Sequence, residues 1–202
     1  KNKKNRGCPE LETSESKLII NDEDICVGVE RRTRGRSEEI IEDFMLVANE
    51  CAARFGMDNN LPFVYRIHEE PSDEKLESLR EALVKLNVQY KLGEKACPGD
   101  MSEILKAAKG TDIDLIMNNI VLRSMSKARY STEPVGHFGL ALEDYAHFTS
   151  PIRRYPDLTI HRIMSAFLSG SSAEECATKF NKFVYASADQ STNCLLYTSP
   201  SP

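Results

Sequence analysis

The sequence lacks the features that mark membrane, secreted and fibrous proteins. Its 202 residues contain no apolar run that approaches the roughly 20 residues needed to cross a bilayer, and no apolar segment follows the lysine-rich start as a secretory signal requires. Its ten glycines and nine prolines follow no fixed period, which excludes a collagen-like chain. At 41% hydrophobic and 28% charged residues, the composition is that of one globular domain. We expect a cytoplasmic chain with no membrane partner.

The cysteines lack the spacing of a metal or disulfide motif. Six are present, at positions 8, 26, 51, 97, 176 and 194, and no two form a C-x-x-C pair. The pattern therefore predicts neither a disulfide framework nor a zinc ribbon. We expect reduced thiols and no disulfide partner.

Net positive charge is also missing, but the charge is unevenly distributed. The formal net charge is −5, which argues against nucleic-acid binding if it is taken as a whole. Residues 37–122 carry nine basic against seventeen acidic groups, whereas residues 123–162 carry six basic against four acidic. Binding phosphate requires only local positive potential. A nucleic-acid surface therefore remains possible outside the acidic middle of the chain.

Hydrophobic periodicity predicts a mixed α/β (α+β) fold, rich in helices and with short antiparallel strands. Apolar residues that recur at three and four positions predict an amphipathic helix over 36–55, the most secure element. Two β-type runs flank the polar cluster Asp22-Glu23-Asp24 and predict a hairpin with an exposed turn. The remaining expected elements are a strand over 61–67, a helix over 73–86 capped by Ser72, and helices over 101–108, 112–125, 156–168 and 173–193.

The last nine residues do not continue the pattern. The helical period that starts at Ala173 breaks at Cys194, and the closing CLLYTSPSP resembles the translation of a sequencing adapter. We expect a domain over residues 1–193, followed by a non-native tail over 194–202 that adds nothing to the fold.

The stretch Gly136–Arg162 has an unusual composition. It contains three histidines, three arginines, two tyrosines and two phenylalanines within 27 residues. Guanidinium groups match phosphate oxygens in a bidentate manner, and aromatic rings offer stacking faces to unpaired bases. The mixture favours single-stranded nucleic acid as the partner. The spacing of His137, His147 and His161 is not that of a zinc site, so no metal site is predicted here.

Within this stretch, the run HFTSPIRRYPD (His147–Asp157) resembles a motif of the ribonuclease II / ribonuclease R family. The runs IIEDFMLVANECAARF, YRIHEEPS, LRSMSKARYSTEPVGHFGLAL and DLTIHR resemble the same family in order and spacing, over about Arg6 to Asn193. The resemblance implies part of an RNB-type catalytic domain. It further implies a processive 3′-to-5′ exoribonuclease that releases nucleoside 5′-monophosphates from single-stranded RNA and uses a divalent metal, usually Mg²⁺.

The family's metal-binding aspartates are not matched. The dense acidic run Asp22-Glu23-Asp24 differs from them in position and pattern. The resemblance therefore implies the C-terminal portion of the catalytic domain, with the Mg²⁺ ligands of the complete enzyme outside this chain. We expect the chain alone to be inactive as a nuclease.

The resemblance assigns roles to individual residues. Arg153 matches the family arginine that contacts the phosphate at the cleavage site, and is the expected catalytic and RNA-binding residue. Arg154 and Arg162 are candidates for further phosphate contacts. Glu42 matches a family glutamate that helps to hold the last nucleotide.

Two aromatic candidates have less specific roles. His147 is expected to hydrogen-bond a loop or the RNA backbone rather than to act as a general base, because the family relies on metal-bound water. Tyr155 is expected either to stack on a base or to pack in the core.

A non-catalytic RNA-binding or adaptor protein derived from the nuclease is the alternative function. In either case we expect a monomer.

Overall fold

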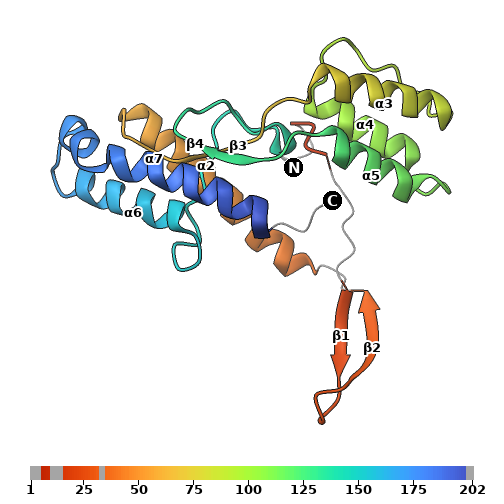
Figure 1. Cartoon of the computed structure of the whole chain (residues 1–202), viewed down its shortest axis with the longest axis horizontal. Coiled ribbons are helices and arrows are strands. Elements are labelled where there is room, and N and C mark those ends of the chain that lie inside the picture. Colours follow the sequence, from red (N-terminus) through yellow and green to blue (C-terminus); the bar gives the residue numbers. More distant parts are fainter. Residues whose placement is uncertain (1–5, 10–15, 32–34, 199–202) are drawn as a thin grey trace.

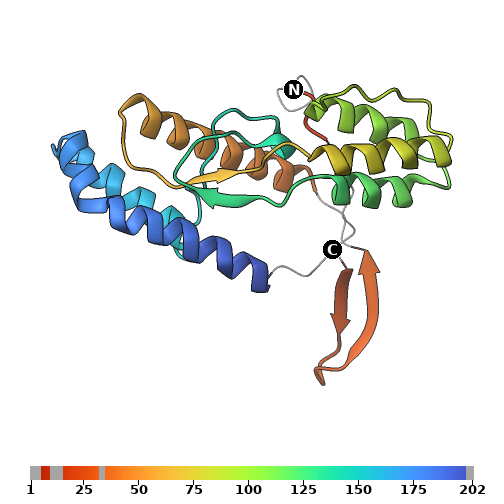
Figure 2. The same ribbon diagram turned by 45° about the horizontal axis from the view of Figure 1, so that its top comes forward.

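The computed structural model describes residues 6–9, 16–31 and 35–198, which form a helix-rich body with a projecting hairpin (Figures 1 and 2). The elements in chain order are β1 (Ser16–Ile20), β2 (Cys26–Arg31), α2 (Arg36–Asp58), β3 (Tyr65–Ile67), α3 (Asp73–Lys85), α4 (Pro98–Ala108), α5 (Asp114–Ser124), β4 (Arg129–Ser131), the 3-10 helix η1 (Phe138–Leu140), α6 (Tyr155–Leu168) and α7 (Ala173–Thr198). The expected mixed fold, with helices and short antiparallel strands, is confirmed. No helix in these ranges is long and apolar enough to span a membrane.

The hairpin forms as the sequence predicts. Strands β1 and β2 pair antiparallel, and the side-chain oxygen of Asn21 accepts hydrogen bonds from the backbone N–H groups of Glu23 and Ile25. This Asx-type turn leaves the acidic run Asp22-Glu23-Asp24 exposed to solvent. The predicted exposed turn is therefore confirmed. Both views show the hairpin standing away from the helices (Figures 1 and 2).

One hydrophobic cluster carries the candidate site. It joins the C-terminal half of α2, the two-stranded sheet β3–β4, and the helices α6 and α7, which lie side by side in both views. Phe63, Ile160 and Ile163 are almost fully buried in it. The ring of Phe63 lies directly against Gly56 of α2, where an added Cβ would collide with it. The glycine therefore sets how closely α2 approaches the sheet.

A second cluster holds α3, α4 and α5 together. Its centre is made of large apolar side chains such as Leu79, Met101, Ile104 and Met117, all buried to 1% exposure or less. Phe138 of η1 belongs to the same cluster. Because η1 precedes the arginine-rich motif along the chain, this contact connects the helical cluster with the part that carries the motif.

Several predicted boundaries are wrong. The strand is limited to Tyr65–Ile67, α4 begins at Pro98 instead of Met101, and strand β4 was not foreseen. Ser72 occupies the N-cap position of α3 but makes no side-chain capping bond. The helical period does not end at Cys194 either, because α7 continues to Thr198 and the half-buried Leu195 packs against the first cluster.

The apolar face of α2 is only half covered within the described structure. Its C-terminal half supplies the buried residues Ala52, which belongs to the predicted stripe, and Ala53, which does not. In the N-terminal half, Ile41, Phe44 and Val47 are each more than half exposed. The predicted amphipathic helix is therefore confirmed, and within the described structure its apolar stripe is buried in the C-terminal half and exposed in the N-terminal half.

Candidate nucleic-acid interface

One buried carboxylate organises the arginine-rich loop. Asp157 lies in the first turn of α6 and has no solvent exposure. Its Oδ2 accepts hydrogen bonds from the backbone N–H of Ser150 and from Nη2 of Arg154, both at 2.8 Å. The backbone N–H of Arg153 in turn donates to the carbonyl of Ser150 at 3.2 Å. Residues 150–154 are thus held as a tight turn in front of the helix.

Arg153 stands on the outside of this turn. Its side chain is exposed and makes no ion pair with any residue that the structure describes, and the neighbouring Ile152 is 98% exposed. The guanidinium is therefore available to a ligand. An exposed planar cation on a fixed turn can bind a phosphate in a bidentate manner.

Arg154 is placed differently from its neighbour. Its Nε and Nη2 both point at Oδ2 of Asp157, at 3.2 and 2.8 Å, and 23% of its side chain is exposed. The guanidinium of Arg154 neutralises the buried carboxylate of Asp157. Its predicted contact with RNA stays a prediction.

The segment before the turn is fixed from two sides. Asn49 of α2 is buried, donates from Nδ2 to the hydroxyl of Tyr145 at 3.1 Å, and accepts the backbone N–H of Phe148 at 2.9 Å. On the other side, Nε2 of His161 pairs with the carbonyl of Phe148 at 2.9 Å, and the two rings stack with centroids 4.1 Å apart. Glu42 lies seven residues before Asn49, on the same face of α2, and is half-buried.

His147 is a half-buried side chain that is neutral at pH 7. Its Nδ1 lies 2.8 Å from the hydroxyl of Tyr130. Burial, together with the positive charges of Arg154 and Arg66, lowers the pKa of His147 to about 3. Burial and the neighbouring His68 lower the pKa of His137 to about 3 as well. At neutral pH these imidazoles add no charge, so the positive potential of the region comes from its arginines.

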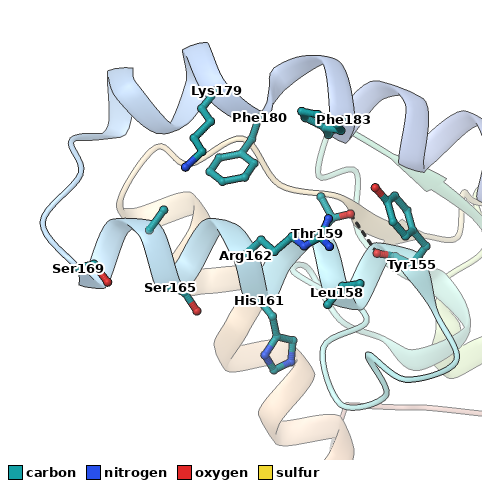
Figure 3. A pocket seen from close by; sticks show the side chains of 11 residues that line it. Tyr155, Leu158, Thr159, His161, Arg162, Ser165, Ser169, Lys179, Phe180 and Phe183 are labelled. Atoms are coloured by element: carbon teal, nitrogen blue, oxygen red, sulfur yellow. Dashed lines mark hydrogen bonds between the residues drawn. The ribbon is translucent and has the colours of Figure 1, made fainter.

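Tyr155 and Arg162 face a separate groove. Seven residues apart on α6, they line a pocket of about 710 Å³ between α6 and α7 together with Lys179 and Phe183 of α7 (Figure 3). The structure thus places Arg153 and Arg154 in the turn and Tyr155 and Arg162 in this groove, whereas Glu42 and His147 lie in neither. Lys179 and Phe183 were missed, because nothing in the sequence shows which face of α7 meets α6. Asn49 was also missed, and its only signal is a polar residue beside an apolar stripe.

No metal site is found in the part of the chain that the structure describes. No group of three or more histidine, cysteine, aspartate or glutamate side chains lies close enough together to hold an ion. The described residues therefore supply no ligand set for Mg²⁺, and the expectation that its ligands lie outside this chain stays a prediction.

Comparisons with known proteins agree on one family. The model of the RNB domain matches residues 1–170. The chain is similar to ribonuclease R 1 of Lactococcus lactis (37% identity, 95% of this chain and 24% of the relative) and to ribonuclease R of Escherichia coli (41% identity, 84% and 21%). Among solved structures it resembles Mycoplasma genitalium RNase R in complex with ribose-methylated single-stranded RNA, with 30% identity and a TM-score of 0.85 over 96% of this chain and 31% of that one. The chain thus spans about a quarter of the length of the curated relatives it matches.

Proposed function

The chain belongs to the RNB domain family, and on that premise we propose that it is part of a 3′-to-5′ exoribonuclease that hydrolyses single-stranded RNA to nucleoside 5′-monophosphates. Relatives named ribonuclease R and a neighbour solved with single-stranded RNA support the activity and the substrate. The observation that carries the proposal is the geometry of Arg153: an exposed guanidinium on a turn that a fully buried aspartate fixes.

In this proposal Arg153 binds the phosphate at the cleavage site. Its planar group donates two parallel hydrogen bonds, and these strengthen as negative charge develops on the phosphate oxygens. Asp157 and Arg154 fix the backbone of the turn, so that only the side chain of Arg153 has to be ordered when RNA binds. Glu42 is proposed to help hold the last nucleotide, from the helix that Asn49 fixes to the motif.

The proposed metal lies elsewhere in the polypeptide. The described residues provide no ligand set for Mg²⁺, so we assign its carboxylate ligands to the part of the enzyme outside this chain. This chain is then the C-terminal portion of the catalytic domain and does not cleave RNA alone. We also propose a monomeric, cytoplasmic enzyme, and a non-native origin for residues 194–202. Sequencing the source gene across these codons tests that origin.

Single-turnover kinetics of the full-length protein test the proposal. We expect Arg153→Lys to retain RNA binding while it lowers the cleavage rate by on the order of 10² to 10³, the cost of losing one transition-state donor. Arg154→Lys is the matched control and keeps its ion pair with Asp157, so it should have a much smaller effect. Equal, mild effects at both positions would refute the role of Arg153. RNA binding without release of mononucleotides would favour the adaptor function.

A further inference from the structure

The groove between α6 and α7 is not used by the proposed chemistry. Its volume of about 710 Å³ lies within the range of small-molecule sites, and it is open to solvent along the helices (Figure 3). Thr159 and the almost buried ring of Phe180 contribute to its lining. The hydroxyl of Thr159 donates back to the carbonyl of Tyr155 at 3.0 Å, so the polar character of the groove comes mainly from its charged residues.

All permanent charges that line the groove are positive. Arg162 projects from α6 and Lys179 from α7, and no aspartate or glutamate is among the described lining residues. Neither cation forms an ion pair with a described residue. The ammonium of Lys179 lies 5.2 Å from the ring centroid of Phe180, a cation–π distance that holds it above an apolar surface. The groove is therefore complementary to an anion.

Two exposed aromatic rings accompany the cations. Tyr155 and Phe183 are 47% and 54% exposed, and Figure 3 shows them on opposite walls, from α6 and α7. Most aromatic residues in the neighbouring core are buried, as Phe63 and Phe180 are. Proteins bind unpaired RNA by combining cations, which contact the phosphates, with aromatic rings, on which the bases stack.

We propose that this groove is a second contact site for single-stranded RNA, in which Arg162 and Lys179 bind phosphate and Phe183, on the wall opposite Tyr155, stacks on a base. The choice of RNA as the ligand rests on the proposed function, whereas binding in the groove does not require that RNA is cleaved. The helix that forms one wall begins two residues after Arg153, and the seven residues from Tyr155 to Arg162 rise about 10 Å along it. One strand can therefore touch both the turn and the groove.

Titration of the folded chain with a fluorescent 12-nucleotide oligoadenylate, at a stated low salt concentration, tests the proposal. We expect Phe183→Ala to weaken binding at least fivefold, as loss of one base-stacking contact does. Lys179→Ala should weaken binding and reduce the dependence on salt by the share of one phosphate contact. Lys182→Ala and Tyr185→Ala are matched controls, because both residues are exposed on α7 outside this groove, and they should bind like the wild type.

Amide NMR spectra of the unmodified chain provide a measurement that does not depend on how the variants fold. Shifts on oligoadenylate addition at residues 179–183 support the groove, whereas shifts confined to residues 147–154 overturn it. Equal affinities of the groove variants and their controls would also overturn it, as would binding of an acidic peptide in place of RNA. None of these results depends on cleavage by the full-length protein, so the proposed function can fail or stand separately.

Discussion

Replacing Asp157 by alanine should destabilise the chain strongly. The carboxylate is fully buried and accepts hydrogen bonds from Ser150 and Arg154, each at 2.8 Å. Breaking a buried ion pair by removing one partner costs about 3 to 5 kcal/mol when the remaining charge stays desolvated. Because Arg154 keeps 23% of its side chain in solvent, part of its hydration can return. We therefore expect a loss near the lower end of that range, about 3 kcal/mol.

Urea unfolding followed by circular dichroism measures this loss, and a double-mutant cycle assigns it. Arg154→Ala and the double variant complete the cycle, and we expect a coupling energy of about 2 kcal/mol between the two sites. Asp157→Asn keeps the size of the side chain and one acceptor for the Ser150 amide, so it should cost less than alanine. The control is Glu81→Ala, which breaks an exposed helical pair with Lys85 worth only about 0.3 to 0.5 kcal/mol.

The reasoning has a clear point of failure. If Asp157→Ala costs no more than Glu81→Ala, the buried carboxylate does not fix the turn. If the effects of Asp157→Ala and Arg154→Ala add without coupling, the ion pair is not the source of the stability. In either case the preorganisation of Arg153 would lose its physical basis.

Two further predictions concern packing and pH. Gly56→Ala should lower stability by about 1 to 3 kcal/mol, because the new methyl group collides with the ring of Phe63. A Tm no lower than that of the control Gly93→Ala, where the new methyl group makes only an ordinary van der Waals contact, would refute this. Since the pKa values of His137 and His147 are lowered to about 3, the unfolded chain binds protons first as the pH falls. Stability should therefore drop from pH 6.5 to 5 by up to about 2 kcal/mol per histidine, and His147→Gln should flatten a plot of the urea midpoint against pH.

The fate of the long helix shows what periodicity can and cannot predict. A repeat of three and four residues places Ile41, Phe44, Ala52 and Phe55 on one side of a helix, and the helix is present. The repeat does not show which other segments of the chain pack against that side. In the described structure Ala52 meets the core and Phe44 is 69% exposed, although both fit the same pattern. Secondary structure is therefore readable from local sequence, whereas burial depends on chain segments that are distant in sequence.

Short strands are hard to predict for the same reason. Strand β4 has only three residues, and its alternation of exposed and buried side chains is too brief to stand out. It exists because Tyr65–Ile67 pairs with it across more than sixty residues of sequence. Residues 61–64 were predicted as part of the strand because they have the composition of one. In the described structure they pair with no other strand, so β3 begins only at Tyr65.

The motif His147–Asp157 could be identified from the sequence, but the residues that position it could not. Asn49 lies beside the apolar stripe of α2, and its role is visible only once Tyr145 and Phe148, nearly a hundred residues later, fold against it. A buried amide without partners costs free energy, so a polar residue at an inward position implies a distant hydrogen-bonding group. Lys179 gives no such signal, because a lysine on a helix surface needs no partner. Inward polar residues such as Asn49 are therefore the positions from which a positioning role can be inferred before a structure is known, whereas groove residues such as Lys179 require the packing of two helices to be seen first.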